Sequence, residues 1–348
     1  VLLEMTLRFA VCAGLAAVLV ACGGSVAPQT SPELSLPPAF ALAGMPSPQS
    51  QRVKQRSWMS PAAKSIKRLL YVAGTLTNTV YVYDYKTRAL VGQLTNLSFN
   101  QPEGECVDKQ GDVWITNWQG KSVIEYAHGG TDPIRTLKLA KFQTACSIDP
   151  TTGNLAVGTF YGELAVWKHA KGEPTNYSSG KCPYMWGPGY DNGGNLFAEA
   201  EVTSTVFICE LAHGATSLQV VPMDWTINFG ADAMWDGKYM AFADQAFGGG
   251  QIGAGLYQAT LTAEGLTLAG STPLDDPCYY GYTDVIQPFI VGRKNTPRND
   301  RQGTVVIGSN NPCLKVVDYW SYPTGGTPTT AIHTPDKVVM GSVVSIKE

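Results

Sequence analysis

Short runs of β-branched, aromatic and alternating apolar residues, separated by glycine-containing turns, recur through most of the chain. The stretch from Pro102 to Tyr126 shows this pattern most plainly. It predicts strands over 105–108, 112–116 and 122–126. Asp108 to Gly111 has the composition of a hairpin turn, because glycine accepts a positive φ without steric cost. The pattern therefore favours an all-β architecture.

The same strand–turn–strand unit returns at nearly constant spacing. The corresponding turn glycines are Gly111, Gly153, Gly194, Gly237 and Gly303, separated by 42, 41, 43 and 66 residues. About forty residues hold four short strands and their turns, which is the size of one propeller blade. We therefore expect residues 66–348 to form a six-bladed β-propeller. Seven blades is the alternative, if the long last interval contains one more.

The two ends of this repeat array complement each other. Residues 341–347 resemble the first strand of a repeat with nothing after it, whereas the array begins at a second strand over 69–73. We expect the last strand to complete the first blade, so that both ends share one closing blade. A ring closed in this way leaves few exposed sheet edges.

Two stretches carry a resemblance to known repeat families. Residues 69–84 resemble the YVTN surface-layer repeat. The stretch from Pro102 resembles the NHL repeat, which also runs Pro-x-Gly, strand, Asp, Gly turn, strand. Both are propeller families, and the resemblance extends at repeat level over about 69–347. It implies the fold and leaves the ligand unnamed.

The amino terminus has the features of an export signal. Arg8 precedes the apolar run 9–21, and Leu19-Val-Ala-Cys22 resembles a bacterial lipobox. This resemblance implies a lipoprotein signal over 1–22 and lipidation of Cys22, which makes the membrane a partner through the lipid anchor. An ordinary secretory signal is the alternative. Gly24 stands where Asp is associated with inner-membrane retention, which favours an extracytoplasmic location at the outer membrane or the cell surface.

The amino-terminal region also raises the question of its start residue and of the segment that follows the signal. The signal is better formed from Met5 than from Val1, so either residue could be the start. Residues 23–65 are rich in Pro, Ser, Gln and Ala, and they cannot build a core because proline fixes extended backbone and removes hydrogen-bond donors. We expect them to form a disordered tether that holds the propeller away from the membrane.

The composition and the net charge argue against one class of partner, nucleic acid. Charged residues make up 15% of the chain and its net charge is −3. Neither value suits a nucleic-acid-binding protein, which would carry a basic patch. We therefore expect no nucleic acid partner.

In a propeller, the loops from fourth to first strands and from second to third strands share one face. Aromatic and polar residues gather in these loops, and large rings bind sugar or peptide surfaces at low entropic cost. The expected ligand is therefore a carbohydrate or a protein segment. The candidate binding residues are Trp118, Trp186, Trp225, Tyr279, Tyr280, Asn117, Glu103 and Asp275. If the face binds a ligand, the three tryptophans should be partly exposed around the channel mouth. The alternative is that the rings pack between blades.

Catalytic motifs are missing from the sequence. It contains no Gly-x-Ser-x-Gly elbow, phosphate-binding loop or His-Glu-x-x-His zinc motif. We therefore assign no catalytic residue and no cofactor, and favour a binding or scaffolding module over an enzyme. The alternative resembles the gluconolactonase/senescence-marker lactonases. That resemblance implies a hydrolase with one divalent metal, Ca, Mg or Zn, near the propeller axis. The candidate ligands are Glu103, Glu105, Asp275 and Asp276.

Six cysteines follow the signal, namely Cys106, Cys146, Cys182, Cys209, Cys278 and Cys313. An exported protein meets an oxidising compartment, so all six are candidates for disulfides. The sequence does not choose among the pairings. Cys106 and Cys146 lie in first strands of adjacent repeats and could instead be small buried apolar residues.

Overall fold

The computed structural model describes residues 56–95, 98–203, 205–250, 253–275, 287–292, 302–310 and 315–347. The chain divides into two units, 1–45 and 46–348, and all described residues belong to the second. Cys22 and the expected signal over 1–22 therefore lie outside the described residues.

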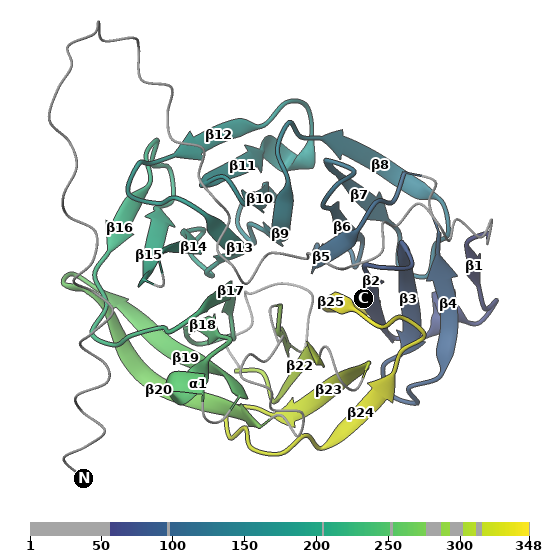
Figure 1. Ribbon diagram of the computed structural model, residues 1–348. Coiled ribbons are helices and arrows are strands. Elements are labelled where there is room, and N and C mark those ends of the chain that lie inside the picture. Colours follow the sequence, from purple (N-terminus) through teal and green to yellow (C-terminus); the bar gives the residue numbers. More distant parts are fainter. Residues whose placement is uncertain are drawn as a thin grey trace, which may run out of the picture. The chain divides into compact units, whose positions relative to one another are not determined.

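The described residues form six antiparallel sheets arranged as blades around an axis (Figure 1). Blade 1 has the order β1–β4–β3–β2–β25, and the other blades have four strands each, in chain order. The strands of blade 1 are β1 (Trp58–Met59), β2 (Arg68–Gly74), β3 (Thr79–Asp84), β4 (Leu90–Leu94) and β25 (Val339–Ile346). Those of blade 2 are β5 (Pro102–Val107), β6 (Val113–Asn117), β7 (Ser122–Tyr126) and β8 (Pro133–Lys138). Those of blade 3 are β9 (Gln143–Ile148), β10 (Leu155–Thr159), β11 (Glu163–Trp167) and β12 (Thr175–Ser178).

The remaining blades follow the same plan. Blade 4 contains β13 (Met185–Tyr190), β14 (Leu196–Val202), β15 (Thr205–Leu211) and β16 (Gln219–Val221). Blade 5 contains β17 (Gly230–Trp235), β18 (Met240–Asp244), β19 (Gly253–Thr262) and β20 (Gly265–Asp275). Blade 6 contains β21 (Phe289–Val291), β22 (Val305–Asn310), β23 (Val316–Ser321) and β24 (Thr330–His333). Helical turns are short: η3 (Ala63–Ser65), η4 (Lys168–Ala170) and α1 (Phe247–Gly250).

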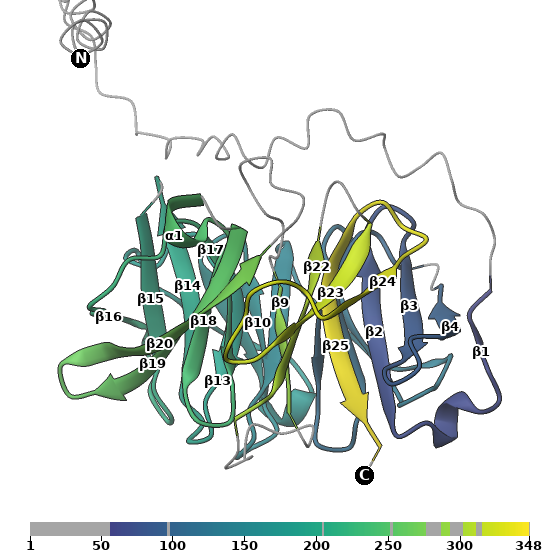
Figure 2. The same ribbon diagram turned by 90° about the horizontal axis from the view of Figure 1, so that it is seen from below.

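The six-bladed propeller is confirmed, and the alternative of seven blades is wrong. Part of the long last interval is taken up by a long hairpin instead of another sheet. Its strands β19 and β20 pair from Gly253 opposite Asp275 to Thr262 opposite Gly265. Figure 2 shows this hairpin extending beyond the neighbouring strands of its blade.

The shared closing blade is also confirmed. Strand β25 pairs antiparallel with β2, from Arg68 opposite Ile346 to Gly74 opposite Val339. Adjacent residues of β25 point to opposite faces of the sheet, as in any strand. Val343 therefore packs in the core between blades 1 and 2, and Val344 packs in the core between blades 1 and 6.

Both faces of a blade are covered by its neighbours, which explains why several strands are apolar without alternation. In β2, the residues from Leu69 to Gly74 are all buried. A sheet that is covered on both faces needs apolar side chains at consecutive positions.

Two disulfides settle the pairing of four cysteines. Cys106–Cys146 joins β5 to β9, the inner strands of blades 2 and 3. Cys182–Cys209 joins the segment before β13 to β15 in blade 4. Cys278 and Cys313 lie outside the described residues.

The end of the expected tether contributes to blade 1. Trp58 and Met59 form β1, which pairs with Gln93 and Gly92 of β4. The ordered sheet therefore begins before residue 66. Among the described residues, no helix is long and apolar enough to cross a membrane.

Candidate functional site

The turns of each blade define two faces of the ring. We call the upper face the one formed by loops that join fourth to first strands and second to third strands, such as 118–121 and 160–162. The lower face carries the turns between first and second strands, such as 108–112 and 149–154. The two faces differ in composition, because the large rings of the sequence prediction fall on the upper one.

A continuous row of aromatic rings crosses the upper face over blades 2 to 5. Trp118 stacks on Phe142 with ring centroids 5.4 Å apart and an interplanar angle of 11°. Phe142 continues to Tyr161 at 6.1 Å, and Trp118 meets Phe160 edge-on at 5.5 Å. The row then continues through the other rings to blade 5. We call this row the aromatic arc, and its members are Trp118, Phe142, Phe160, Tyr161, Tyr184, Trp186 and Phe229.

The arc has an exposed end and a buried end. Tyr161 is 54% exposed. Trp118 and Phe142 are half-buried, so each keeps part of its ring accessible to solvent. Lys121 lies over the Phe142 ring with Nζ 5.0 Å from its centroid, and Lys141 pairs with Glu163 at 2.9 Å. The exposed end therefore combines flat apolar surface with charged groups at its border.

The expected convergence of three tryptophans around the mouth is wrong. Trp186 is only 6% exposed, and its Nε1 donates a hydrogen bond to Glu201 Oε2 at 3.2 Å. Trp225 is half-buried in a different group of rings, with Phe242 at 6.1 Å and Tyr257 at 6.2 Å. Both side chains pack against other rings of the core, because burying a large ring removes much apolar area from water. Trp118 alone of the three belongs to the exposed end of the arc.

Asn117 is a structural residue and is not available to a ligand. It is the last residue of β6, and its side chain is fully buried. Oδ1 accepts a hydrogen bond from the Asn100 backbone at 2.6 Å. Nδ2 donates to Ser98 O at 2.7 Å and to Ser122 Oγ at 3.1 Å. A buried amide requires such partners, which here come from the loop before β5 and from the first residue of β7. Tyr279 and Tyr280 lie outside the described residues.

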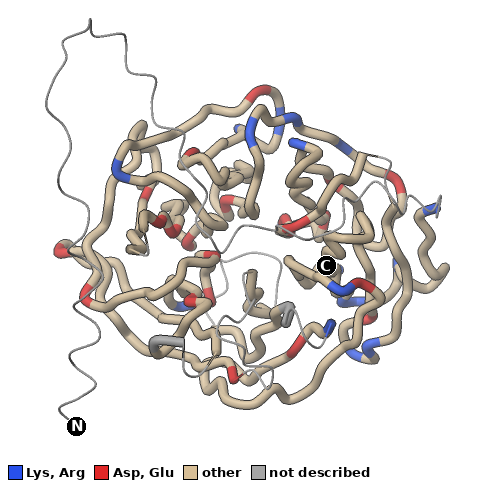
Figure 3. The backbone as a smooth tube through the Cα atoms, viewed as in Figure 1, with Lys and Arg blue, Asp and Glu red and all other residues tan. Residues whose placement is uncertain are grey.

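Acidic side chains approach the axis from several blades. Figure 3 shows acidic positions on the inner parts of blades and many of the basic positions toward the outer rim. Burial raises the pKa of Glu103 well above its ordinary value, and repulsion from Asp232 raises it further. Burial raises the pKa of Asp232 to about 8, although the Gly187 amide donates to its Oδ1 at 2.8 Å. Burial likewise raises the pKa values of Glu105 and Glu199 well above the usual range.

The metal-ligand set expected from the sequence does not assemble. Glu103 and Glu105 lie on β5, the inner strand of blade 2, but Asp275 ends β20, the outermost strand of blade 5. The Asp275 carboxylate instead accepts a hydrogen bond from Thr327 at 3.5 Å. Asp276 lies outside the described residues. The sequence analysis missed Glu199 and Asp232, whose signal was a carboxylate between two alanines inside a mainly apolar strand.

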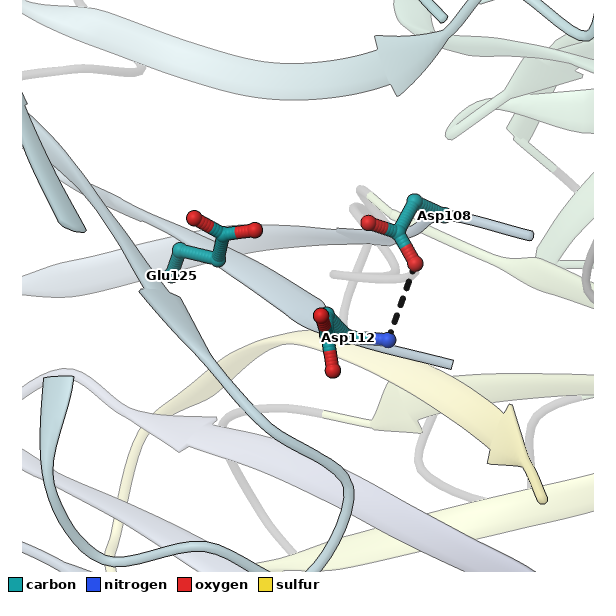
Figure 4. Close-up of side chains that lie close together, drawn as sticks. All are labelled: Asp108, Asp112 and Glu125. Atoms are coloured by element: carbon teal, nitrogen blue, oxygen red, sulfur yellow. Dashed lines mark hydrogen bonds between the residues drawn. The ribbon is translucent and has the colours of Figure 1, made fainter. Parts of the chain in front are cut away.

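A second acidic group lies on the lower face of blade 2 (Figure 4). Carboxylate oxygens of Asp108, Asp112 and Glu125 lie within 4.8 Å of one another. Burial raises the pKa of Asp108 to about 6 and that of Glu125 to about 7. Arg135 partly offsets the second effect through an ion pair at 3.3 Å.

This acidic group borders a cavity of about 410 Å³ between blades 2 and 3. Asp108 also caps its own turn, because Oδ1 accepts the backbone N–H groups of Gln110 and Asp112. Asp108 is recognisable as a turn residue from the sequence, whereas the proximity of Glu125 follows only from strand pairing.

Comparison with known proteins supports the fold. Residues 62–159 match the SMP-30/Gluconolactonase/LRE-like region. The search of curated proteins found no match. A chain of the nidogen/laminin complex is 12% identical, with 81% of this chain and 99% of that chain covered and a TM-score of 0.60. A chain of Kuenenia stuttgartiensis hydrazine synthase is 15% identical, with 78% and 79% covered and a TM-score of 0.51. The expected propeller fold is thus confirmed, and the match over 62–159 includes Glu103 and Glu105.

Proposed function

We propose that this propeller is a binding module that takes a carbohydrate or peptide ligand on the exposed end of the aromatic arc. The observation that carries the proposal is the solvent-accessible stack formed by Trp118, Phe142 and Tyr161. An aromatic ring that stays in water contributes no burial energy to folding. A ligand that covers the ring removes its apolar area from water and gains that free energy on binding.

The shape and border of this surface favour a sugar as the first choice. Trp118, Phe142 and Tyr161 present the ring surface that their stacking leaves uncovered, and an aromatic surface suits the C–H face of a pyranose. Lys141 and Glu163 lie close by and offer a donor and acceptors to hydroxyl groups. An extended peptide could use the same groups, so both ligand classes belong in the test.

Substitution of the exposed rings tests the proposal. A panel of immobilised oligosaccharides and peptides first identifies a bound ligand for the purified protein. Trp118→Ala and Tyr161→Ala should then each weaken binding by about tenfold or more, equivalent to about 1.4 kcal/mol. Trp58→Ala is the matched control, because Trp58 is also exposed but lies on the outer edge of blade 1. Equal affinity of all three variants and the unaltered protein would exclude the arc as the binding surface.

A metal-dependent hydrolase is the second candidate, supported by the acidic channel and the match over 62–159. The carboxylates of Glu103 and Asp232 have the right chemistry to hold calcium or magnesium. Such an ion would polarise a lactone carbonyl and activate water. Among the described residues, however, the channel acids do not form a group of three within 4.8 Å, as Asp108, Asp112 and Glu125 do. The binding role therefore has the stronger support.

Lactone hydrolysis distinguishes the two candidates. For the binding role, we expect no hydrolysis of gluconolactone above background with calcium, magnesium or zinc. Metal-dependent hydrolysis that disappears in Glu103→Gln would establish the hydrolase instead.

We further propose that the chain is exported and anchored through a lipid on Cys22, with residues 23–65 as the spacer. The disulfides Cys106–Cys146 and Cys182–Cys209 support export, because such bonds persist in oxidising compartments. Cys22→Ala should abolish incorporation of labelled fatty acid and move the protein to the soluble fraction. Persistent labelling of the variant would disprove the anchor.

A further inference from the structure

The lower face carries a cavity of about 410 Å³ between blades 2 and 3, on the opposite face from the aromatic arc. Its apolar lining includes Val107, Ile148 and Pro150, and Trp114 of β6 also borders it. Small-molecule pockets usually span about 300–1,000 Å³, so this cavity has the volume to hold a compound of monosaccharide size. A single ion would leave most of it empty.

Three carboxylates border this cavity and come from three segments of blade 2 (Figure 4). Asp108 follows β5, Asp112 precedes β6 and Glu125 lies on β7. Glu125 is only 5% exposed, and among the described residues its Oε2 accepts no hydrogen bond. Its charge partner is Arg135, whose Nε lies 3.3 Å away. The group therefore keeps acceptor oxygens for a further partner.

A buried indole N–H group faces the same carboxylates. Trp114 is 1% exposed, and its Nε1 has no hydrogen-bond partner of normal geometry in the part of the chain that the structure describes. Burial, followed by repulsion from Asp112, raises the pKa of Asp108 to about 6, whereas the Trp114 N–H acts in the opposite direction. This N–H is thus directed toward the acidic group. A buried donor without a partner is costly, and an oxygen atom of a ligand would satisfy it.

The spacing of the carboxylates suits an ammonium group. Three acceptors that each take one N–H of an ammonium, at about 2.7–2.9 Å and in tetrahedral directions, lie about 4.4–4.7 Å from one another. One oxygen from each of Asp108, Asp112 and Glu125 lies within 4.8 Å of the other two. A metal ion fits less well, because the Trp114 N–H cannot coordinate it and the cavity is far larger than one ion.

We propose that this cavity binds a small organic ammonium compound that carries an oxygen acceptor near its charged nitrogen, as an amino sugar or an amino alcohol does. We call it the amine pocket. The ammonium group donates to Asp108, Asp112 and Glu125, and the oxygen accepts from Trp114 Nε1. The amine pocket shares no residue with the aromatic arc, so either proposal can fail while the other stands.

Basic groups border the amine pocket without neutralising it. Arg135 pairs with Glu125, and its Nη1 donates to the Ala170 carbonyl of blade 3, so this guanidinium is held at the border between the two blades. The remaining basic lining residues are exposed, where solvent screens their charges, namely Lys109, His169 and Lys171. The buried carboxylates therefore dominate inside the pocket, which favours a cationic ligand over an anionic one.

Calorimetric titration of the full chain with matched ligands tests the proposal. Glucosamine is compared with glucose, and ethanolamine with ethylene glycol, since each pair differs only in an amine that replaces a hydroxyl. We expect each amine to bind at least about tenfold more tightly than its neutral counterpart.

Binding of the amine should also release protons at pH 6.5. Burial raises the pKa of Glu125 to about 7, with Arg135 opposing this shift and Asp108 and Asp112 adding to it. Asp108 and Glu125 are therefore partly protonated at this pH, and an ammonium group favours their ionised forms. The release appears as a difference in heat between buffers of different ionisation enthalpy.

Three variants locate the bound amine. Glu125→Gln and Asp112→Asn should each weaken glucosamine binding by about tenfold or more, because each removes one charged acceptor. Asp132→Asn is the matched control, since it removes an equal charge from an exposed position in blade 2 outside the cavity lining and should bind like the unaltered protein. If Glu125→Gln fails to fold, the half-buried Asp112 still decides the question.

Four results would overturn the proposal. They are the absence of binding by both amines, equal affinity for glucosamine and glucose, undiminished binding in the acidic-group variants, and loss of binding in Asp132→Asn alone. Calcium chloride is titrated in parallel. Calcium that binds the unaltered protein but not Asp112→Asn, while neither amine binds, would identify the acidic group as a metal site instead.

Discussion

Removal of β25 is the sharpest test of how this ring is held together. A chain that ends at Val338 lacks four aliphatic side chains, namely Val339, Val343, Val344 and Ile346, none more than 4% exposed. Full burial of such a side chain contributes about 1.5–3 kcal/mol, so the four together contribute about 6–12 kcal/mol. The whole free energy of unfolding of a typical domain is about 5–15 kcal/mol. We therefore expect the truncated chain to lose its cooperative transition.

Circular dichroism during heating measures this effect. The control is a chain that lacks only residues 347–348, which lie beyond β25 and should cost little. A synthetic peptide of residues 337–348 should restore part of the transition when it is added in excess, because it supplies the missing strand. If the truncated chain melts cooperatively within a few degrees of the full chain, closure by β25 does not stabilise the ring and our reasoning fails.

Three further predictions concern single contacts. Trp186→Ala should lower the free energy of unfolding in urea by about 3–5 kcal/mol, because a buried ring is lost; a cost below 1 kcal/mol would contradict its interblade role. Folding raises the pKa of Glu125 from 4.5 to about 7, so stability should fall as pH rises through this range, and Glu125→Gln should flatten that dependence in melts from pH 4 to 8. Replacing Cys106 and Cys146 by serine opens a link of sequence separation 40 and should cost about 4 kcal/mol in urea; unchanged stability would show that the link constrains nothing.

The fold was predictable because it depends on local patterns that repeat. The spacing of Gly111, Gly153, Gly194 and Gly237 reports blade length directly, and each of these glycines adopts a positive φ at its turn. The orphan strand at the carboxyl end predicted the closing blade for the same reason. The last interval misled only in suggesting a seventh blade, since a long hairpin and a further blade differ little in composition.

The site was predictable only in part, because it depends on which way a side chain faces in the ring. The sequence placed Trp118 and Trp186 on the same face. Trp118 lies in the turn after β6 and is half-buried, whereas Trp186 is the second residue of β13 and is buried. Asn117 is polar and ends β6, yet its side chain binds the backbone of Ser98 and Asn100 in the loop before β5. Asp275 was placed near the axis, although the fourth strand of a blade is the outermost.

Two links that hold the ring together differ in kind, one between blades 2 and 3 and one within blade 1, and this difference implies where the ring fails under load. Between blades 2 and 3 the inner strands are joined covalently by Cys106–Cys146, whereas β2 and β25 are joined by hydrogen bonds and packing. A pulling force or a swelling solvent should therefore open the ring first in blade 1, where β25 separates from β2. Blades 2 and 3 would then separate last at the axis. A reducing agent would remove that difference and allow the ring to part at either place.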